Sequence, residues 1–368
     1  MVNTLSHLGI GLLIASFAGL TGRKRAIVAF MAVLPDLDFF LDGLLTLFGG
    51  IISHELYNQL YYFMGHREFM HSLLFLFFIT FALWFYSKDR IFALAGFASI
   101  FSHVYLDYAT NWKMRPLYPF VQEPSIMGSM DSLDPVITLI SFVPLYFLAV
   151  EILKDRDFHK QWMERRWSSI LENRVRIEKG LVLLLVFWCA LTPISKAVLV
   201  DQISEKEGYD ISYQNTYPKS FGVFLSAYQY NETHYKLLET SYWSGIERSM
   251  YVPAVIVLEN SEGDDIETYM QYSTDIYSSS PFQEIDYPVY IISSNEELVT
   301  VMLVDARNPF ALYWTYFRTE YVFEFSRDTD EFTAYSRRFT DQMTEVNGNW
   351  FEKKAYAMTI SPFFAHMK

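Results

Sequence analysis

The sequence of 368 residues has a single cysteine, Cys189, and few charged residues for its length. One cysteine excludes a disulfide framework and a zinc site built from several thiolates, so any metal must be held by His, Asp and Glu. Charged residues make up 19% of the chain and hydrophobic residues 51%, which excludes a disordered protein. The net charge is −13 and there is no long basic tract, so nucleic acid is not an expected partner.

The chain divides into two halves of different composition. Residues 1–200 hold 17 Lys and Arg against 16 Asp and Glu, whereas residues 201–368 hold 12 against 26 and have no long apolar run. The first half contains six apolar stretches, each near the roughly 20 residues that cross a bilayer. They are residues 5–20, 26–48, 69–87, 91–110, 135–153 and 180–200. The sequence therefore predicts a polytopic α-helical membrane domain with about six transmembrane helices. No basic segment precedes the first stretch, so we expect it to be retained and not cleaved as a signal peptide.

The positions of Lys and Arg between these stretches predict the orientation of the chain in the membrane. Three basic residues lie in the first loop, two lie between the third and fourth stretches, and eight lie in the segment 154–179. With six spans these loops share one side, which should be cytoplasmic, so residues 201–368 would face outward. Segment 154–179 mixes both charges with Trp and Ile, and it is expected to form an amphipathic loop or helix at the cytoplasmic surface. Residues 180–200 would then be the last transmembrane helix.

Ionisable side chains interrupt the apolar stretches, and such residues inside a membrane are functional candidates by default. By the predicted topology they all lie in the outer half of their helix or in an outward loop. They are His7, Asp36, Asp38, His66, His71, His103, Asp107, Asp131 and Asp134. His103 and Asp107 are four residues apart, which places both on one helix face. Pro35 should break its helix directly before Asp36 and free backbone groups there.

The residues from His7 to Asp107 suggest a metal site, because imidazole and carboxylate are the ligands that Zn, Mn and Fe accept. A single His in a membrane more often bonds to another helix, so the prediction depends on the whole set. We expect one or two divalent transition metal ions, Zn first among them, with Asp38 either a direct ligand or the partner of one. Arg67 could stabilise phosphoryl charge, and Asp38 or Glu68 could act as a catalytic base.

The order of these motifs resembles the membrane-bound metal-dependent hydrolase family of the YdjM, YbcI and YfhP type. The resemblance covers about residues 1–155. It is carried by His7, Pro35-Asp36-Leu37-Asp38, His66-Arg67, His71-Ser72, Ser102-His103, Asp107, Pro116-Leu117-Tyr118-Pro119-Phe120 and Asp134-Pro135. It implies a metal-dependent hydrolase in the cytoplasmic membrane and leaves the substrate open. Two positions differ from the family's pattern, because Asn3 stands where a close branch has Asp and Glu68 stands where the family usually has Gly. Glu68 could therefore be an extra ligand, a base or a loop residue.

The second half of the chain has the alternating pattern of β-strands. Three segments, residues 252–273, 287–306 and 320–339, each place turn residues between runs of β-forming residues, which predicts a strand, a turn and a second strand. The sequence therefore indicates an antiparallel, β-rich extracytoplasmic domain over residues 201–368. It would follow a hydrolase-like membrane domain over residues 1–153.

The favoured function is a metal-dependent hydrolase that acts on an ester or phosphoester at the outer face of the cytoplasmic membrane. A site at headgroup depth favours a membrane lipid or a lipid-linked substrate. One alternative is a cation or proton transporter, because intramembrane His and Asp also line ion paths. Such a path needs polar groups at both depths of the membrane. The other alternative is a structural or signalling protein whose outer β-domain binds a partner, with the metal only holding the helices together.

Overall fold

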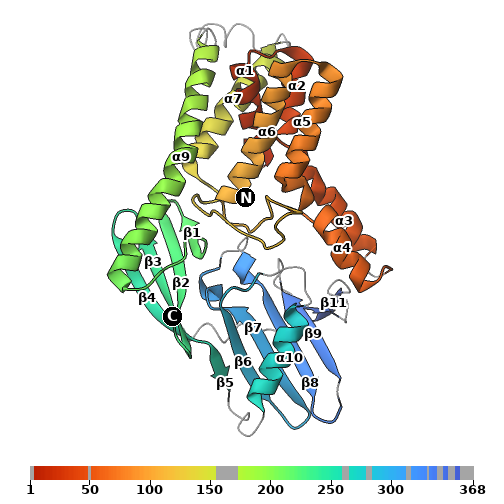
Figure 1. The fold of residues 1–368 in the computed structure, drawn as a ribbon, viewed down its shortest axis with the longest axis vertical. Coiled ribbons are helices and arrows are strands. Elements are labelled where there is room, and N and C mark those ends of the chain that lie inside the picture. Colours follow the sequence, from red (N-terminus) through yellow and green to blue (C-terminus); the bar gives the residue numbers. More distant parts are fainter. Residues whose placement is uncertain are drawn as a thin grey trace. The chain divides into compact units, whose positions relative to one another are not determined.

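The computed structural model describes residues 4–48, 51–154, 173–258, 265–278, 284–311, 316–329, 331–337, 343–346 and 353–356. The chain forms two compact units, one helical and one β-rich (Figure 1). The helical unit comprises Met1–Leu41, Gly65–Val198 and Pro218–Phe221, and the β-rich unit comprises Asp42–Met64, Leu199–Tyr217 and Gly222–Lys368. The predicted order, a helical region followed by a β-rich region, is confirmed.

The helical unit is an assembly of apolar helices with two short 3-10 helices. Its elements are α1 (Thr4–Phe17), α2 (Gly22–Met31), η1 (Leu34–Leu37), η2 (Phe69–His71), α5 (Leu73–Ser87), α6 (Arg90–Ala109), α7 (Pro135–Lys154) and α9 (Arg174–Glu207), the last of which continues into the β-rich unit. Glycines let α1 approach its neighbours closely, as small residues do in membrane helices. A Cβ on Gly9 would overlap the Ser141 carbonyl oxygen of α7, and one on Gly11 would lie 2.9 Å from that of Ala29 in α2.

Among the described residues, three helices are long and apolar enough to cross a membrane, namely α6, α7 and α9. A fourth span is present if residues Gln59–His71 and Leu73–Ser87, which meet at a 68° bend, are taken together. Helix α1 is apolar but shorter. The stretch 26–48 is interrupted as Pro35 predicts, because α2 ends at Met31 and η1 precedes α3 (Asp38–Phe48). Three to four candidate spans are thus established, and the count of six stays a prediction.

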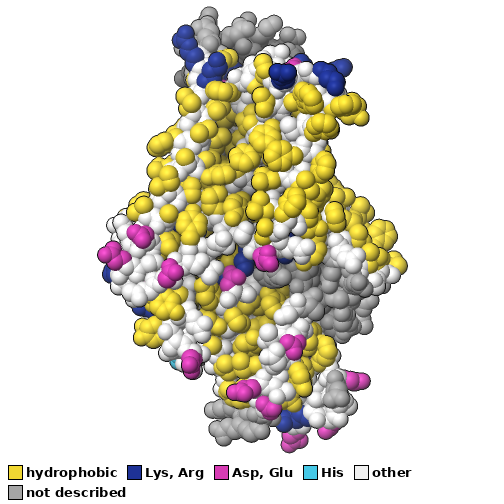
Figure 2. Space-filling model, viewed as in Figure 1, with side chains coloured by type: hydrophobic (Ala, Val, Ile, Leu, Met, Phe, Trp, Pro, Cys, Tyr) yellow, Lys and Arg dark blue, Asp and Glu magenta, His cyan; other side chains and the backbone are white. Residues whose placement is uncertain are grey.

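Polar side chains define the ends of the central helices. The Ser72 hydroxyl accepts a hydrogen bond from the Phe75 amide at 3.2 Å and caps α5, while the Asp89 carboxylate accepts one from the Phe92 amide at 3.1 Å and caps α6. Basic side chains gather at the end of this unit where α2 begins and α5 ends (Figure 2). Here Lys24 contacts Asp89 at 2.5 Å.

The β-rich unit contains two sheets in the part of the chain that the structure describes. The first has the order β1 (Thr216–Ser220), β2 (Val223–Asn231), β3 (His234–Ser241) and β4 (Gly245–Pro253). The second has the order β11 (Lys353–Tyr356), β10 (Met343–Val346), β9 (Phe332–Arg337), β8 (Glu320–Ser326), β7 (Leu298–Asp305), β6 (Pro288–Ser294) and β5 (Val255–Val257). Neighbours in the second sheet are antiparallel except β5 and β6, which are parallel. Three helices, α4 (His54–Met64), α10 (Ile266–Ser278) and most of α3, complete the unit.

Two of the three predicted strand pairs are present, and the third prediction was wrong. Segments 287–306 and 320–339 form β6–β7 and β8–β9. In segment 252–273 the second strand is replaced by α10, because the Asp265 carboxylate accepts a hydrogen bond from the Thr268 amide at 3.2 Å and caps a helix. Ile266, Tyr269 and Met270 then recur at helical spacing and pack on the core of the second sheet. The turn predicted at residues 263–264 lies outside the described residues.

The other predicted boundaries differ in position from the observed elements. Most of the predicted amphipathic segment, residues 155–172, lies outside the described residues. Helix α9 begins at Arg174 and runs unbroken to Glu207. Helical structure therefore extends beyond residue 200, where the β-rich domain was expected to begin, and the first strand starts only at Thr216.

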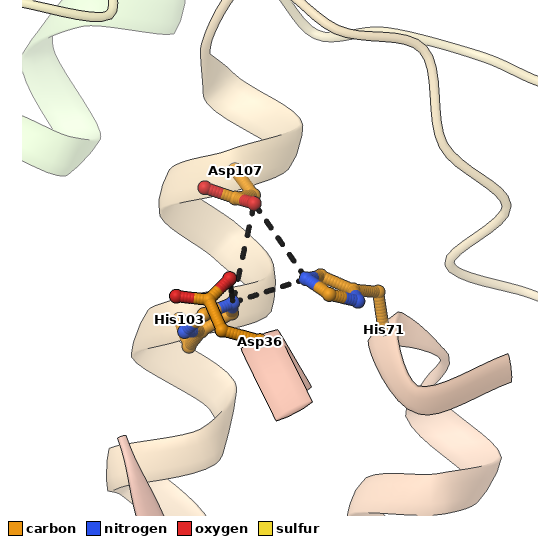
Figure 3. Close-up of side chains that lie close together, drawn as sticks. All are labelled: Asp36, His71, His103 and Asp107. Atoms are coloured by element: carbon orange, nitrogen blue, oxygen red, sulfur yellow. Dashed lines mark hydrogen bonds and ion pairs between the residues drawn. The ribbon is translucent and has the colours of Figure 1, made fainter. Parts of the chain in front are cut away.

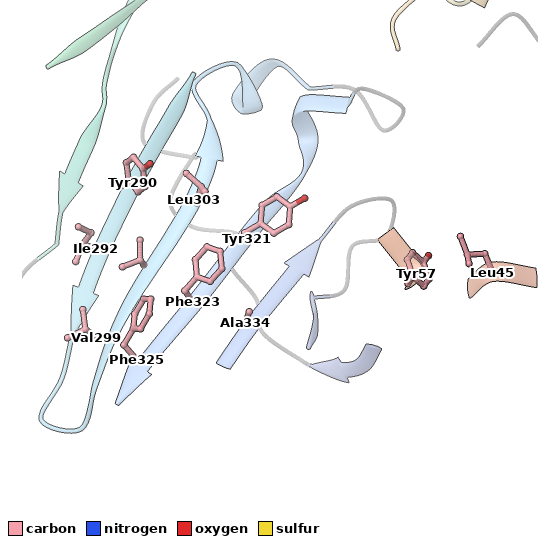
Figure 4. Packing of buried hydrophobic residues seen from close by; sticks show 11 residues of the cluster. Leu45, Tyr57, Tyr290, Ile292, Val299, Leu303, Tyr321, Phe323, Phe325 and Ala334 are labelled. Atoms are coloured by element: carbon pink, nitrogen blue, oxygen red, sulfur yellow. The ribbon is translucent and has the colours of Figure 1, made fainter. Parts of the chain in front are cut away.

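Alternate residues of β6, β7 and β8 build the core of the second sheet (Figure 4). Residues two apart in a strand point to the same face, and this face is apolar and buried. Its members from β7 and β8 are Val299, Val301, Leu303, Tyr321, Phe323 and Phe325. Leu45 of α3 and Tyr57 of α4 belong to the same cluster. Residues 42–64 therefore join the β-rich unit, although the sequence placed them in a membrane stretch and an outward loop.

Arg307 is fully buried among acidic and aromatic side chains of the β-rich unit. Its Nε donates to Asp305 Oδ1 at 2.8 Å and its Nη2 donates to Asp286 Oδ2 at 2.6 Å. The guanidinium carbon lies 4.7 Å from the ring centroid of Phe317. A charge can remain in such a place only because it is paired, and removing one partner leaves the other uncompensated.

Replacing Arg307 with methionine should lower the free energy of unfolding by about 3–5 kcal/mol, because Asp305 and Asp286 lose their buried cation. Thermal unfolding of the detergent-purified protein, followed by tryptophan fluorescence, would measure the change. Arg248→Met on β4 is the control, since Arg248 is exposed and its loss should cost less than about 0.5 kcal/mol. Equal shifts in the two variants would contradict the assigned role of the buried pair.

Candidate metal site

Four side chains of the helical unit converge on one point (Figure 3). Asp36, His71, His103 and Asp107 each offer a ligand atom, and these atoms lie within 4.8 Å of one another. His103 Nε2 lies 3.1 Å from His71 Nε2 and 3.5 Å from Asp36 Oδ1. Asp107 Oδ2 lies 3.6 Å from His71 Nε2 and 3.9 Å from His103 Nε2. His71, His103 and Asp107 are buried, and Asp36 retains partial exposure.

The break after α2 orients His103. Its Nδ1 lies 2.7 Å from the carbonyl oxygen of Ala32. Because the chain changes to a 3-10 helix at this point, the Asp36 amide donates to Val33 instead of Ala32, which leaves the Ala32 carbonyl available. With Nδ1–H donated to that carbonyl, Nε2 is the nitrogen that faces the cluster.

Asp38 orients His71 in the same manner. Its Oδ2 lies 2.9 Å from His71 Nδ1 and also accepts a hydrogen bond from the Arg67 amide at 2.9 Å. Its Oδ1 lies 2.7 Å from His66 Nδ1. A carboxylate that holds the far nitrogen of a histidine fixes the ring and directs the other nitrogen to a metal. Asp38 therefore fixes the His71 ring through its Nδ1 atom, and the Nε2 atom of His71 faces the cluster.

These contacts make the cluster suitable for a cation. When both Nδ1 atoms are protonated, the Nε2 lone pairs of His71 and His103 face each other at 3.1 Å. The carboxylates of buried Asp107 and partly exposed Asp36 add two negative charges beside these lone pairs, and Arg67 pairs with Asp107 alone. A divalent transition metal resolves this conflict, since two imidazoles and two carboxylates are ligands that Zn, Mn and Fe accept. The residues present thus fit a metal.

Two further histidines adjoin the cluster without belonging to it. The His7 ring stacks on that of His103 with centroids 3.8 Å apart, and His7 Nε2 lies 3.3 Å from Asp107 Oδ1. His66 contacts Asp38, and its side chain is 27% exposed. The predicted metal set therefore divides into four converging residues and three, His7, Asp38 and His66, that touch them. Direct ligation by these three stays a prediction.

Arg67 lies at the edge of the cluster. Its Nη2 is 3.1 Å from Asp107 Oδ2, and its guanidinium carbon is 5.3 Å from the ring centroid of Trp112. Its backbone has a positive φ of 71°, which is uncommon for a residue other than glycine. Its Nε and Nη1 are buried and have no hydrogen-bond partner among the described residues. Arg67 therefore has donors available to an anion beside the cluster.

Glu68 points to a different partner. Its carboxylate forms a buried ion pair with Arg115, whose Nε also donates to the Gln122 carbonyl oxygen at 2.5 Å. The Leu73 amide, at the start of α5, also donates a hydrogen bond to the Pro116 carbonyl oxygen in the loop after α6, at 2.9 Å. Glu68 thus connects the chain before α5 to the loop after α6, and it lies outside the group of four. Its predicted catalytic role stays untested.

The sequence alone did not identify several contributors. The Ala32 carbonyl, the Trp112 ring and Arg115 carry no metal-binding motif, although Arg115 is the one arginine in segment 111–134. Asp134 has a structural role instead. Its Oδ1 accepts a hydrogen bond from the Ile137 amide at 2.9 Å and caps α7, and Trp188 Nε1 donates to Oδ2 at 3.2 Å.

One protein family matches this chain. The family described as YdjM inner membrane protein matches residues 1–197, more than half of the chain. The chain belongs to the YdjM family. This is a membrane-bound metal-dependent hydrolase family, so the resemblance inferred from the motifs is confirmed, and the chain is a member of a family of inner membrane proteins. No curated protein and no solved structure matches the chain.

The matched region contains all the site residues named above and ends before β1. Most of the β-rich unit therefore lies beyond the matched region. The helical unit holds the elements that position the buried Asp and His group, which could bind a metal ion of unassigned identity.

Replacing Asp38 with asparagine should weaken metal binding about 10- to 100-fold, because His71 loses the carboxylate that orients it. Titration of the purified protein with a competing chelator would measure the affinity. Asp131→Asn provides the matched control, since Asp131 is an acidic residue of the same sequence series outside the group of four. Unchanged affinity in Asp38→Asn would show that His71 needs no such support.

Proposed function

We propose that this YdjM family protein is a membrane-embedded, metal-dependent hydrolase that cleaves an ester or phosphoester of a lipid or lipid-linked substrate. The observation that carries the proposal is the convergence of Asp36, His71, His103 and Asp107 beside Arg67. A purely structural metal site is closed on all sides, whereas a catalytic site keeps an open position. Partial exposure of Asp36 and of neighbouring His66, at 17% and 27% of their side chains, supports the catalytic alternative.

The four converging residues would hold the ion, with Zn our first candidate and Mn or Fe the others. One ion fits the group of four, and a second would require His7 or His66 as ligands. When bound, a divalent ion supplies Lewis acidity that polarises the substrate and lowers the pKa of water. The buried donors of Arg67 would bind the negative charge of a phosphoryl or carboxyl oxygen.

His66 and Asp38 form the best-placed pair for proton transfer. Their contact at 2.7 Å uses His66 Nδ1 and leaves Nε2 of a partly exposed ring for the substrate. Asp38 itself contacts His66, His71 and the Arg67 amide, and Glu68 is paired with Arg115. We therefore assign the proton-transfer role to His66, with Asp38 as its positioning residue.

We further propose six membrane crossings, with the metal site and residues 201–368 on the outer side of the cytoplasmic membrane. The site residues lie at the start of α1 and α5 and at the end of α2 and α6, which is one end of the helical unit. The basic residues Lys24 and Lys88 lie at the other ends of these helices. Loops rich in Lys and Arg are retained in the cytoplasm, and this supports an outward site.

Cysteine labelling tests that orientation. In a Cys189→Ser background, a membrane-impermeant maleimide should label Glu296→Cys, in the exposed turn between β6 and β7, on right-side-out membrane vesicles. The matched position, Lys88→Cys between α5 and α6, is equally exposed and should react only after the vesicles are opened. The opposite pattern would invert the proposed topology.

The hydrolase assignment is tested by incubating the purified protein, loaded with Zn, Mn or Fe, with a lipid extract of the cell envelope. Released headgroups or acyl chains should appear with the wild type and should be absent with His103→Ala or excess chelator. Absence of product with all three metals would overturn the proposal. Ion flux in liposomes that depends on His103 would then favour a transporter.

A further inference from the structure

Helix α3 carries an apolar face that the fold leaves exposed. Phe39, Phe40, Leu44, Leu47 and Phe48 are exposed by 67%, 69%, 45%, 76% and 53%. Phe40, Leu44 and Leu47 are three to four residues apart, and Phe39 and Phe48 adjoin them, so the five lie on one side of the helix. An exposed surface of this kind usually marks contact with a partner or a membrane. With 11 residues, α3 is too short to cross the ~30 Å of a bilayer.

The opposite side of α3 is already used. Leu45 is 2% exposed and belongs to the core cluster of the β-rich unit, together with Tyr57 of α4. Helix α4 also exposes apolar side chains, with Leu56 at 43% and Phe63 at 52%. Both helices are therefore amphipathic, with one side packed in the protein and an apolar side outside it. Hydrophobic side chains gather over this pair in Figure 2.

The apolar face begins beside the metal site. Helix α3 starts at Asp38, one residue after η1 ends. The Phe39 ring lies edge-on to the ring of His66, with centroids 6.3 Å apart. Thr4, next to Leu5, donates to Asp36 Oδ2 at 2.8 Å, and Leu5 is 57% exposed. The two site residues that reach the surface, Asp36 and His66, are therefore bordered by exposed apolar side chains.

We propose that α3 and α4 lie in the boundary between lipid headgroups and acyl chains, and that α3 forms a lateral access route from the lipid to Asp36 and His66. The access route rests on the proposed hydrolase function, whereas the position of the helices does not. The access route specifies the substrate as a membrane-resident amphiphile. Its headgroup would reach the site while its acyl chains lie along Phe39 and Phe40.

Three features favour a lipid surface over a second copy of the chain. Helix α3 begins within the helical unit at Asp38, directly after η1 and without an intervening loop. From Phe39 to Phe48 its only charged residue is Asp42, so the face has no ion-pairing groups for a protein partner. Helix α4 also carries the partly exposed Tyr62, and aromatic residues of this kind concentrate at the membrane interface.

Spin-label depth measurements test the position of α3 without any need for turnover. In the full-length Cys189→Ser protein in lipid nanodiscs, nitroxides would be attached at Phe40→Cys and Leu47→Cys. Two references bracket them, Leu183→Cys on α9, which is 67% exposed within a candidate span, and Glu296→Cys in the exposed turn after β6. We expect the ratio of oxygen to nickel-chelate accessibility at Phe40 and Leu47 to lie between those of the two references.

Two results would overturn the interfacial position. Nickel-chelate accessibility equal to that at Glu296→Cys would place α3 in water. Low accessibility to both reagents would show that protein covers the face, and dipolar broadening between labels would identify a second copy of the chain.

The access route has a separate test. Leu47→Glu should lower the rate on phospholipid in vesicles and leave the rate on a soluble probe, bis-p-nitrophenyl phosphate, unchanged. Equal rates on vesicle lipid for wild type and variant, or equal losses on both probes, would overturn the route. If the wild type cleaves neither probe, the hydrolase proposal and the route fail together, while the depth measurement still decides the position of α3.

Discussion

His103→Ala is expected to lose its metal, from about one ion per chain in the wild type to background level. His103 Nε2 lies within 3.5 Å of both His71 Nε2 and Asp36 Oδ1, so its removal takes away the residue that connects the group. Alanine offers no ligand, and the two carboxylates then keep only one imidazole. Elemental analysis of the detergent-purified protein would measure the metal content.

The matched control is His234→Ala, because His234 belongs to β3 in the other unit and should leave the metal content unchanged. His71→Ala and Asp107→Asn should repeat the loss seen for His103→Ala. Retention of full metal content in all three site variants would contradict the assignment of this cluster as the binding site.

Arg67→Lys is expected to lower kcat by about 10²–10³-fold while the metal content stays intact, a loss similar to that of one preorganised donor in an oxyanion site. The guanidinium contacts Asp107 through Nη2 and has two further buried donors, Nε and Nη1, beside the cluster. Lysine keeps the positive charge near Asp107 but presents a single ammonium instead of a planar fork. Turnover of the lipid that the wild type cleaves fastest would measure the effect.

Arg115→Lys provides the comparison for a buried arginine that has another task, since Arg115 pairs with Glu68. A smaller loss of turnover is expected for it, because lysine can keep the ion pair. If Arg67→Lys cleaves the lipid at the wild-type rate, Arg67 has only a structural role. If it loses metal in proportion to activity, its role is to hold Asp107.

Much of the general organisation was predictable from the sequence. Membrane helices and solvent-exposed strands differ in hydropathy and in side-chain period, so the division near residue 200 appears in composition alone. The interruption at Pro35 follows from the missing amide of proline. The pairing of His103 with Asp107 follows from helix geometry. Each of these conclusions depends on residues close together in the chain.

Other features depend on context that the sequence did not reveal. Residues 266–273 alternate well enough to resemble a strand, yet the Asp265 cap and the core of the second sheet stabilise a helix over Ile266–Ser278. Residues 42–64 belong to the β-rich unit through Leu45 and Tyr57. Burial of one face by a distant element decides both outcomes, since tertiary packing overrides local preference.

The sequence by itself determined which chemistry this protein can hold, because the His and Asp residues in apolar surroundings are countable and their ligand preferences are intrinsic. Only the tertiary structure decided which of them meet. Asp36, His71 and His103 come from separate elements, and Ala32 and Asp38 turn the histidines toward one another. Close helix contacts at Gly9 and Gly11 set the distances between elements. Such distances depend on how whole helices pack, which no local spacing in the chain encodes.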